Sequence, residues 1–295
     1  MSALLTLLIH PVAADDTRTD FADTFTEVAA TEPALRVGEL STQRGDGIFE
    51  TIGVVDGHAQ EAGPHLERLR NSARICDLAA PNIAQWTAAI EVAVSALPAT
   101  GEFSIKLVLS RGVEHGPAPT AWLVAQSAPD FSAVRVDGIR VVTLDRGYDR
   151  LAAERAPWLL LGAKTLSYAV NMAALREAAR RGADDTIFVS SDGFVMEGPT
   201  SSVILRHGEV YSTPAPSGAI LHGTTQMSLF EHIEASGKPA EYREIPVADL
   251  ESADAGWLVS SVRLAAPITA IDGRPVPVDA VETRAFTEYL LSPRD

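Results

Sequence analysis

The chain has 295 residues, of which 46% are hydrophobic, and its 24 basic and 39 acidic residues give a formal net charge of −15. This composition is typical of a soluble globular protein with one large domain or two ordinary ones, and it excludes a disordered chain. The negative charge repels phosphate backbones and anionic lipid, so we expect no nucleic-acid partner and no membrane partner.

The cysteine content and the N-terminal segment indicate the compartment. The single cysteine, Cys76, excludes an internal disulfide and is typical of a reducing environment. The apolar run Ala3–Ile9 is short, follows no basic segment and precedes no small-residue cleavage site, so we expect no signal peptide. No stretch reaches the roughly 18 to 20 apolar residues that span a bilayer. The sequence therefore predicts a cytoplasmic protein.

Residues 1–127 have the pattern of a small N-terminal α+β domain. Its predicted elements are a strand over Gly47–Val55, a helix over His65–Leu78, a helix from an N-cap at Asn82 to Leu97, and strands over Phe103–Leu109 and Ala121–Gln126. Residues 128–136 are polar and contain a proline, so we predict a linker there.

Residues 137–295 are predicted to form a larger C-terminal domain. The predicted elements are a strand over Ile139–Leu144, a helix over Tyr168–Arg181, hairpins with turns at Ser191–Gly193 and His207–Gly208, a helix over Thr224–Ala235, strands over Trp257–Ser260 and Ile268–Ile271, and a helix over Ala280–Leu290. Strands and helices thus occur in both parts of the chain.

Lysine is scarce in this chain, since only Lys106, Lys164 and Lys238 are found among the 24 basic residues. A chain that otherwise uses arginine retains lysine where a primary amine is required, as in Schiff-base chemistry. Lys164 follows the apolar run Trp158–Leu161 and precedes a predicted helix, so we expect burial to lower its pKa towards the neutral amine. The alternative is an ammonium group that extends to solvent at the boundary of an element.

Three other features along the chain complete a pattern. Arg68 lies early on a predicted helix, Glu197 ends a predicted strand, and Thr224 and Thr225 open a predicted helix after a glycine. Each alone has an ordinary explanation: a solvated helix face, a polar turn, or an N-cap. Together with Lys164 they supply an amine for an aldehyde, a carboxylate for a pyridine nitrogen, a phosphate cup and a guanidinium. A pyridoxal-5′-phosphate (PLP) site requires these parts.

With these residues in this order, the chain resembles the class IV PLP-dependent aminotransferases. This D-amino-acid/branched-chain aminotransferase-like family also contains 4-amino-4-deoxychorismate lyase, to which the chain is most similar. The resemblance extends from Gly45 to Gly273, and the matching segments are Gly45–Thr51, His65–Leu69, Lys164–Ser167, Glu197–Ser202, Gly223–Thr225 and Ser260–Ser261.

The resemblance implies an α/β fold in a two-domain α+β form, the PLP fold type IV, with PLP between the domains and a homodimer. Lys164 would form the Schiff base and act as acid and base, and Glu197 would pair with the pyridine nitrogen. The cofactor phosphate would be held by Arg68, Thr224, Thr225 and Ser261. No metal is expected.

Four positions depart from the commonest pattern of the family. Ser202 replaces a frequent asparagine, His222 a frequent proline, and Gln226 a frequent arginine, while Arg44 stands where an aromatic residue is common. None of these changes removes a catalytic group, so they bear on the substrate rather than on PLP binding.

Two activities compete within the resemblance. A lyase eliminates pyruvate from aminodeoxychorismate to leave 4-aminobenzoate, a folate precursor, whereas a D-amino-acid or branched-chain aminotransferase passes the amino group to a keto acid. The segments Lys106–Gly112 and Trp257–Pro267 resemble the lyase group and favour the lyase. The alternatives are the aminotransferase, dual activity and, more remotely, a non-catalytic PLP-binding protein.

The substrate of either activity is a small carboxylate, so the site needs local cations. Arg111, His115 and Arg263 are the predicted holders of its carboxylates. For each of the three, a surface or structural role is the equal alternative.

Overall fold

A computed structural model describes residues 3–216 and 218–295. Contacts within the chain divide it into two units. Unit 1 comprises Met1–Pro129, Ala163–Tyr168 and Pro293–Asp295, and unit 2 comprises Asp130–Gly162 and Ala169–Ser292. Lys164 therefore belongs by its contacts to unit 1, although it lies within the range 137–295 predicted as the C-terminal domain.

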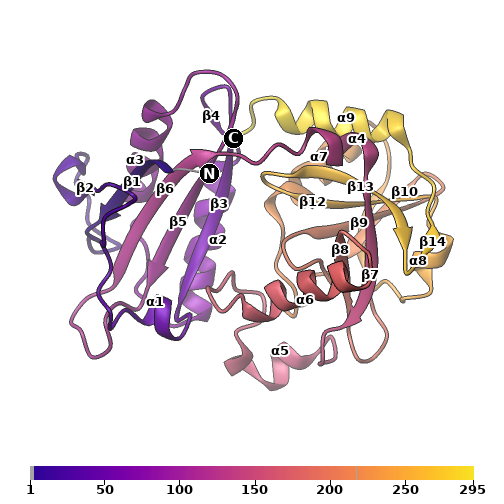
Figure 1. Cartoon of the computed structure of the whole chain (residues 1–295), viewed down its shortest axis with the longest axis horizontal. Coiled ribbons are helices and arrows are strands. Elements are labelled where there is room, and N and C mark those ends of the chain that lie inside the picture. The colour runs from indigo at the N-terminus through magenta and orange to yellow at the C-terminus, as the bar shows by residue number, and fades with distance from the viewer. Residues whose placement is uncertain (1–2, 217) are drawn as a thin grey trace. The chain divides into compact units, whose positions relative to one another are not determined.

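Unit 1 is built on a six-stranded antiparallel sheet with the order β2-β1-β6-β5-β3-β4. The strands are β1 (Ala3–Ile9), β2 (Phe25–Glu27), β3 (Gly47–Val55), β4 (His58–Ala59), β5 (Glu102–Ser110) and β6 (Thr120–Ser127). Helices α2 (Ala62–Ile75) and α3 (Ile83–Ala96) contact the sheet, and two shorter helices, η1 (Ala22–Thr24) and α1 (Leu40–Gln43), lie in the connections (Figure 1).

The strand register gives this sheet two different faces. Opposed residues share a face, and successive residues alternate between faces. Ile48, Ile52 and Leu107 are fully buried on the face that also carries Glu50, which bonds to α2. The other face carries Phe49 and Thr51 of β3, which lie opposite Val108 and Lys106 of β5. It also carries Trp122 of β6, the strand on the other side of β5, where Trp122 lies opposite Val108. We call it the open face, because Thr51 and Trp122 are half-buried and Lys106 is exposed.

Unit 2 contains an eight-stranded mixed sheet with the order β11-β10-β9-β12-β13-β7-β8, in which β14 pairs with β13. The strands are β7 (Ile139–Asp145), β8 (Asp185–Val189), β9 (Ser202–His207), β10 (Val210–Pro214), β11 (Ala240–Arg243), β12 (Ala255–Ser260), β13 (Leu264–Ile271) and β14 (Arg274–Pro275). The helices are α4 (Ser132–Asp137), α5 (Ala152–Arg155), η2 (Pro157–Leu159), α6 (Ala169–Arg180), α7 (Thr224–Ala235), α8 (Asp249–Ser252) and α9 (Ala280–Leu291).

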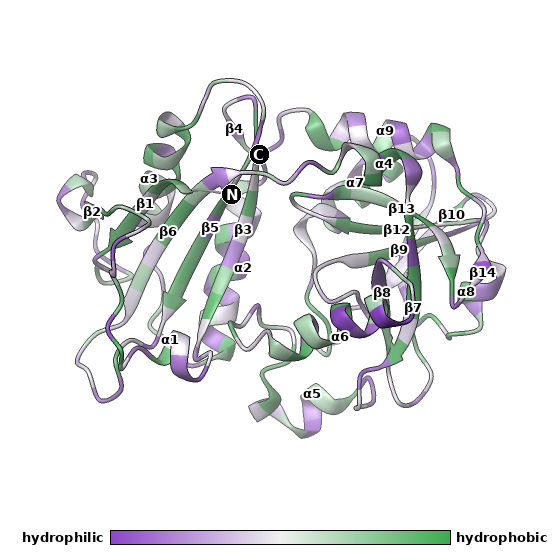
Figure 2. Cartoon of the chain, viewed as in Figure 1, coloured by the Kyte–Doolittle hydropathy of each residue, from purple (hydrophilic) through white to green (hydrophobic). Residues whose placement is uncertain are grey.

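The core of unit 2 lies on both faces of its sheet. Trp257 and Phe286 pack together in one buried cluster with residues of α7 and α9, while Leu258 belongs to a second cluster with Ile245 and Leu250. Adjacent residues of β12 thus point into different clusters, as strand alternation requires. Figure 2 shows apolar colouring along many of the strands.

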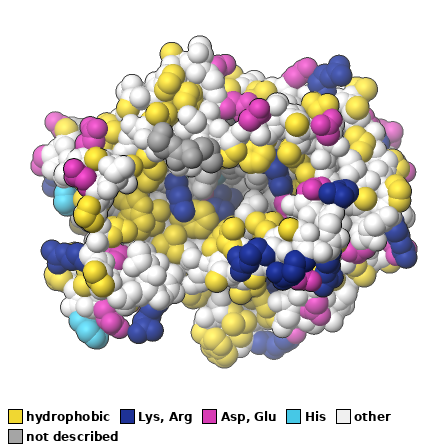
Figure 3. Space-filling view, viewed as in Figure 1, with side chains coloured by type: hydrophobic (Ala, Val, Ile, Leu, Met, Phe, Trp, Pro, Cys, Tyr) yellow, Lys and Arg dark blue, Asp and Glu magenta, His cyan; other side chains and the backbone are white. Residues whose placement is uncertain are grey.

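Basic side chains gather over α6 on the face shown in Figure 3. Arg180, the last residue of this helix, and Arg181, which follows it, both pair with Glu177 of α6, so the cluster is partly neutralised. None of the helices in the described part of the chain is long and apolar enough to cross a membrane.

Several predicted elements agree with the structure, and others do not. The strand Gly47–Val55 and the helix Thr224–Ala235 have the predicted bounds, and Asn82 caps α3 by accepting a hydrogen bond from the backbone of Gln85. The predicted linker 128–136 contains most of α4, and the second arm of the hairpin predicted at 191–193 forms only single bridges. Propensity is a weak guide for such short segments, because tertiary contacts decide their conformation.

Candidate active site

Lys164 lies in a segment that extends the edge of β3. Its carbonyl accepts a hydrogen bond of 2.9 Å from the backbone N–H of Phe49, and the N–H of Leu166 donates to the carbonyl of Gly47 over 2.8 Å. The N–H of Lys164 itself donates to Ser72 Oγ of α2 over 3.1 Å. The backbone of Lys164 is thus fixed at both its N–H and its C=O by unit 1.

The side chain of Lys164 extends over an aromatic ring. Its Nζ lies 4.8 Å from the centroid of the Phe49 ring. The Tyr168 ring meets Phe49 edge-on, with centroids 5.3 Å apart and planes at 83°. A cation near a ring gains about 0.5–1 kcal/mol at an exposed site, and more as water is removed. The rings therefore orient the amine of Lys164 on the open face of the unit 1 sheet.

Arg68 is held by a buried carboxylate on the opposite face of β3. Its Nε and Nη2 each donate to Glu50 over 2.7 Å, and His65 Nδ1 lies 2.7 Å from the same carboxylate. Burial alone would raise the pKa of Glu50, but the charge and hydrogen bonds of Arg68 and His65 hold it well below its usual range. Burial lowers the pKa of His65 despite its bond to Glu50. Arg68 as a phosphate ligand stays a prediction.

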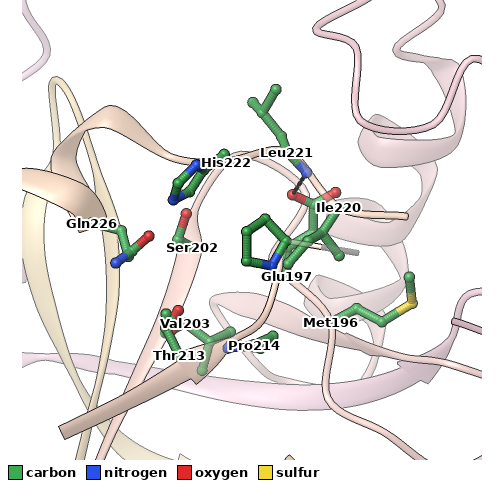
Figure 4. A pocket seen from close by; sticks show the side chains of 11 residues that line it. Met196, Glu197, Ser202, Val203, Thr213, Pro214, Ile220, Leu221, His222 and Gln226 are labelled. Carbon is green, nitrogen blue, oxygen red and sulfur yellow. Dashed lines mark hydrogen bonds between the residues drawn. The ribbon is translucent and has the colours of Figure 1, made fainter. Parts of the chain in front are cut away.

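Glu197 lies after β8 in unit 2, where its backbone and its carboxylate are both bonded. Its carbonyl accepts from the N–H of Phe188 over 2.8 Å, and its Oε2 accepts from the N–H of Leu221 over 3.1 Å. The residue lines a small pocket together with Ser202, His222 and Gln226 (Figure 4). A half-buried carboxylate that faces such a pocket is suited to hold a protonated ring nitrogen.

The N-terminus of α7 brings the other predicted phosphate ligands together. Thr224 and Thr225 are buried in its first turn, and Thr225 Oγ1 lies 3.3 Å from Ser261 Oγ, which follows β12. The N-cap residue, Gly223, makes no side-chain cap. Helix N-termini attract anions through their first N–H groups and the helix dipole. The described residues therefore fit a phosphate at this position.

Gly223 allows Ser202 to approach this helix N-terminus closely. A Cβ at position 223 would lie 2.3 Å from Ser202 Oγ, which no real contact permits, but 3.4 Å from Ser202 Cβ, an acceptable distance. We therefore expect Gly223→Ala to lower the free energy of unfolding by about 1–3 kcal/mol, the usual cost of overpacking. The double variant Gly223→Ala/Ser202→Ala should recover most of this loss in urea denaturation. An equal loss in the double variant would contradict the steric explanation.

Arg111, a predicted substrate ligand, is occupied by structural partners in unit 1. Its Nε donates to Asp46 over 2.7 Å, its Nη1 to the carbonyl of Asp77 over 3.0 Å, and its Nη2 to the carbonyl of Cys76 over 2.8 Å. The hydrogen bond with Asp46 raises the pKa of Arg111. A substrate carboxylate would have to compete with all three partners.

The other two predicted substrate ligands differ from each other. His115 is exposed in a unit 1 loop and has a left-handed backbone with φ of 60°. Arg263 is in unit 2, where its Nη1 donates to buried Asp185 over 2.6 Å. Its Nε and Nη2 are buried and have no hydrogen-bond partner among the described residues. The structure therefore places Arg111 and His115 in one unit and Arg263 in the other.

Sequence reasoning did not single out the residues that position Lys164 and Arg68, which are Phe49 and Ser72 for the lysine and Glu50 for the arginine. Phe49 and Glu50 lie within the segment Gly45–Thr51 that matched the family, so that segment carried a signal for both. Ser72 carried none, because it is 92 positions from Lys164 in the sequence and only the fold brings them together.

Comparison with known families decides the class. The family model described as amino-transferase class IV matches residues 47–271. The chain belongs to the class IV aminotransferase family. It is 46% identical over 255 residues to the bifunctional aminodeoxychorismate lyase / D-amino acid transaminase of Mycobacterium tuberculosis, covering 83% of this chain and 88% of that protein.

Solved structures agree with this class. A fold IV-transaminase from Curtobacterium pusillum matches with a TM-score of 0.92 and 48% identity over 98% of this chain and 99% of that chain. The PLP-bound form of a hypothetical aminotransferase from Mycobacterium tuberculosis matches with a TM-score of 0.87 and 42% identity over 97% of each. The predicted α/β fold of type IV is therefore confirmed, and this class IV protein is a PLP-dependent enzyme.

Proposed function

We propose that this class IV enzyme is a 4-amino-4-deoxychorismate lyase, which eliminates pyruvate to give 4-aminobenzoate, and that it also has D-amino acid transaminase activity. The observation that carries the proposal is its 46% identity to a relative whose name contains both activities. We also propose that it supplies folate synthesis, works as a homodimer and resides in the cytoplasm.

PLP, when bound, supplies a ring that withdraws electrons from the bonds at the α-carbon of the substrate. We propose that Lys164 Nζ is the amine that carries the cofactor covalently and later moves the α-proton. The Glu197 carboxylate holds a proton on the pyridine nitrogen, and the hydrogen bond from Leu221 keeps its Oε2 in place. Arg68, the first turn of α7 and Ser261 bind the phosphate. Both activities need removal of the same α-proton. The lyase then eliminates pyruvate, whereas the transaminase passes the amino group to a keto acid.

A paired assay of the purified enzyme tests the activity. In the first assay, aminodeoxychorismate is supplied and both pyruvate and 4-aminobenzoate are measured. In the second, D-alanine and 2-oxoglutarate are supplied and pyruvate is measured. We expect product in both assays. Turnover of D-alanine without any 4-aminobenzoate would overturn the lyase and leave the transaminase alone.

The role of Glu197 gives a separate prediction. Glu197→Gln keeps an oxygen that accepts from Leu221, so the fold is expected to be unchanged, but an amide does not hold a proton on the ring nitrogen. We expect kcat to fall by about 10²–10³-fold in both assays, the range for loss of one preorganised electrostatic group. Glu209→Gln is the matched control, since Glu209 is exposed in the turn before β10. Equal kcat values for the two variants would contradict the role.

A further inference from the structure

The turn between β12 and β13 carries Ser261, and its backbone is strained. Ser260 and Leu264 lie opposite each other in the strand register, so the turn consists of Ser261, Val262 and Arg263. Leu264, which closes the turn, has a φ of 64°, in the left-handed region that L side chains rarely adopt. Such a conformation persists only where the surrounding structure fixes it.

A buried arginine of α4 holds this turn by its carbonyl groups. Arg135 Nε donates to the carbonyl of Arg263 over 3.0 Å, and Arg135 Nη2 donates to the carbonyl of Val262 over 2.9 Å. A guanidinium presents its N–H groups in a rigid fork, so binding two successive carbonyls at once fixes the orientation of both peptide groups. Helix α4 packs against β13, the strand that follows the turn, and so brings Arg135 to it (Figure 1).

The side chain of Arg263 attaches the same turn to the sheet of unit 2. Its Nη1 donates over 2.6 Å to Oδ2 of Asp185, which is buried at the start of β8. The other oxygen of this carboxylate accepts from the backbone N–H of Thr186 over 2.8 Å. The turn is therefore attached by its backbone to α4 and by a side chain to β8.

Both attachments lie within two residues of a predicted phosphate ligand. Ser261 directly precedes Val262, and its Oγ lies 3.3 Å from Thr225 Oγ1 in the first turn of α7. A hydroxyl group contributes most to anion binding when it is already held in place before the anion arrives. Loss of the bonds to the turn would free Ser261 to move away from Thr225.

We propose that Arg135 is a positioning residue of the phosphate site, where it fixes the turn 261–263 and so keeps the Ser261 hydroxyl in position for the phosphate. This inference rests on the proposed function, because it takes Ser261 as a phosphate ligand. Arg135 touches neither the cofactor nor the substrate in this role and acts only through the turn. Helix α4, most of which lies in the predicted linker 128–136, thereby serves the site.

The test uses the full-length enzyme without bound cofactor and two probes, pyridoxamine 5′-phosphate and pyridoxamine. Neither probe has an aldehyde that reacts with a lysine, and only the first has a phosphate. Calorimetry measures the Kd of each. We expect Ser261→Ala to raise the Kd of pyridoxamine 5′-phosphate about 10- to 100-fold, the range for loss of one hydrogen bond to a charged group. Arg135→Met should raise it about 10-fold, and the Kd of pyridoxamine should stay unchanged in both variants.

Three further variants distinguish positioning from a general structural role. Arg135→Met/Ser261→Ala should bind the phosphate probe as Ser261→Ala does, because residues that act through one contact do not have additive effects. Arg135→Lys should recover part of the affinity, since an ammonium group can bond to one of the two carbonyls. Arg140→Met is the matched control, because Arg140 pairs with Asp184 at the surface, and it should bind as the wild type does.

The outcomes separate this inference from the proposed function. Wild-type enzyme that binds no pyridoxamine 5′-phosphate, or turns over neither substrate, would overturn the proposed function and this inference with it. In active enzyme, an unchanged Kd in Arg135→Met, an equal rise for both probes, or independent effects of the two substitutions would overturn only the role of Arg135. If Arg135→Met does not fold, Arg135→Lys decides: a higher Kd for the phosphate probe alone supports the role, and an unchanged Kd contradicts it.

Discussion

Lys164→Ala should abolish covalent attachment of PLP and lower kcat by about 10²–10⁴-fold in both reactions, the range for loss of a positioned acid–base group. The structure predicts that the variant folds, because the bonds from Lys164 to Ser72 and Phe49 use its backbone N–H and C=O. The fall in activity should therefore come with an unfolding free energy within about 0.5 kcal/mol of wild type. Borohydride reduction followed by peptide mapping measures the attachment.

The control for this experiment is Lys238→Ala, which removes a lysine of unit 2 that pairs with Glu282. It should retain attachment and kcat. In wild-type enzyme the pyridoxyl adduct should be found on Lys164. An adduct on Lys238, or full attachment in Lys164→Ala, would show that the amine has been assigned to the wrong residue.

Glu50→Ala should lower the free energy of unfolding by about 3–5 kcal/mol, because it leaves the Arg68 guanidinium without its buried partner. Arg68 is 12% exposed and Glu50 fully buried, so water compensates little of the loss. Glu67→Ala on the same helix is the control. Glu67 pairs with Arg70 at the surface, where ion pairs contribute about 0–1 kcal/mol. Urea denaturation of the apo proteins measures both, and equal losses would contradict the buried pair.

The contribution of Glu50 should also depend on pH in a defined direction. Its pKa is lower in the folded protein than the value of about 4.3 expected for an unfolded glutamate. The stabilisation is therefore complete above that unfolded value and is lost as the pH falls towards the folded pKa. The stability difference between wild type and Glu50→Ala should be constant from pH 6 to 8 and shrink below about pH 4. A difference that grew on acidification would contradict this sign.

Local signals in the sequence predicted much of the fold. The β-forming run Gly47–Val55 and the capping residue Asn82 each specify an element through nearby residues, and both agree with the structure. The strand Ala3–Ile9 was not predicted, because a short apolar run without alternation does not distinguish a strand from other buried segments. Helix α4, most of which lies within 128–136, is too short for periodicity to show it.

The candidate site, like the fold, was predicted from the sequence only in part. The order of Lys164, Glu197 and Thr224 along the chain predicted a PLP enzyme, and comparison with known proteins confirmed that class. The partners of Arg111 and Arg263 could not be predicted, because each arginine bonds to residues distant in sequence. The contact of Lys106 with Phe49 could not be predicted either, because it depends on the strand register between β3 and β5.

The short segment Ala163–Tyr168 determines how unit 1 could be produced as a separate fragment. It belongs to unit 1 by its contacts, yet the chain on both sides of it belongs to unit 2. A fragment ending near residue 129 would therefore lack the partner that bonds to Gly47 and Phe49, and would expose part of β3 as an open sheet edge. Such edges invite pairing with other chains. A soluble form of unit 1 would need the segment Ala163–Tyr168 supplied in trans or fused to it, so an intact edge of β3 and Lys164 can only be obtained together.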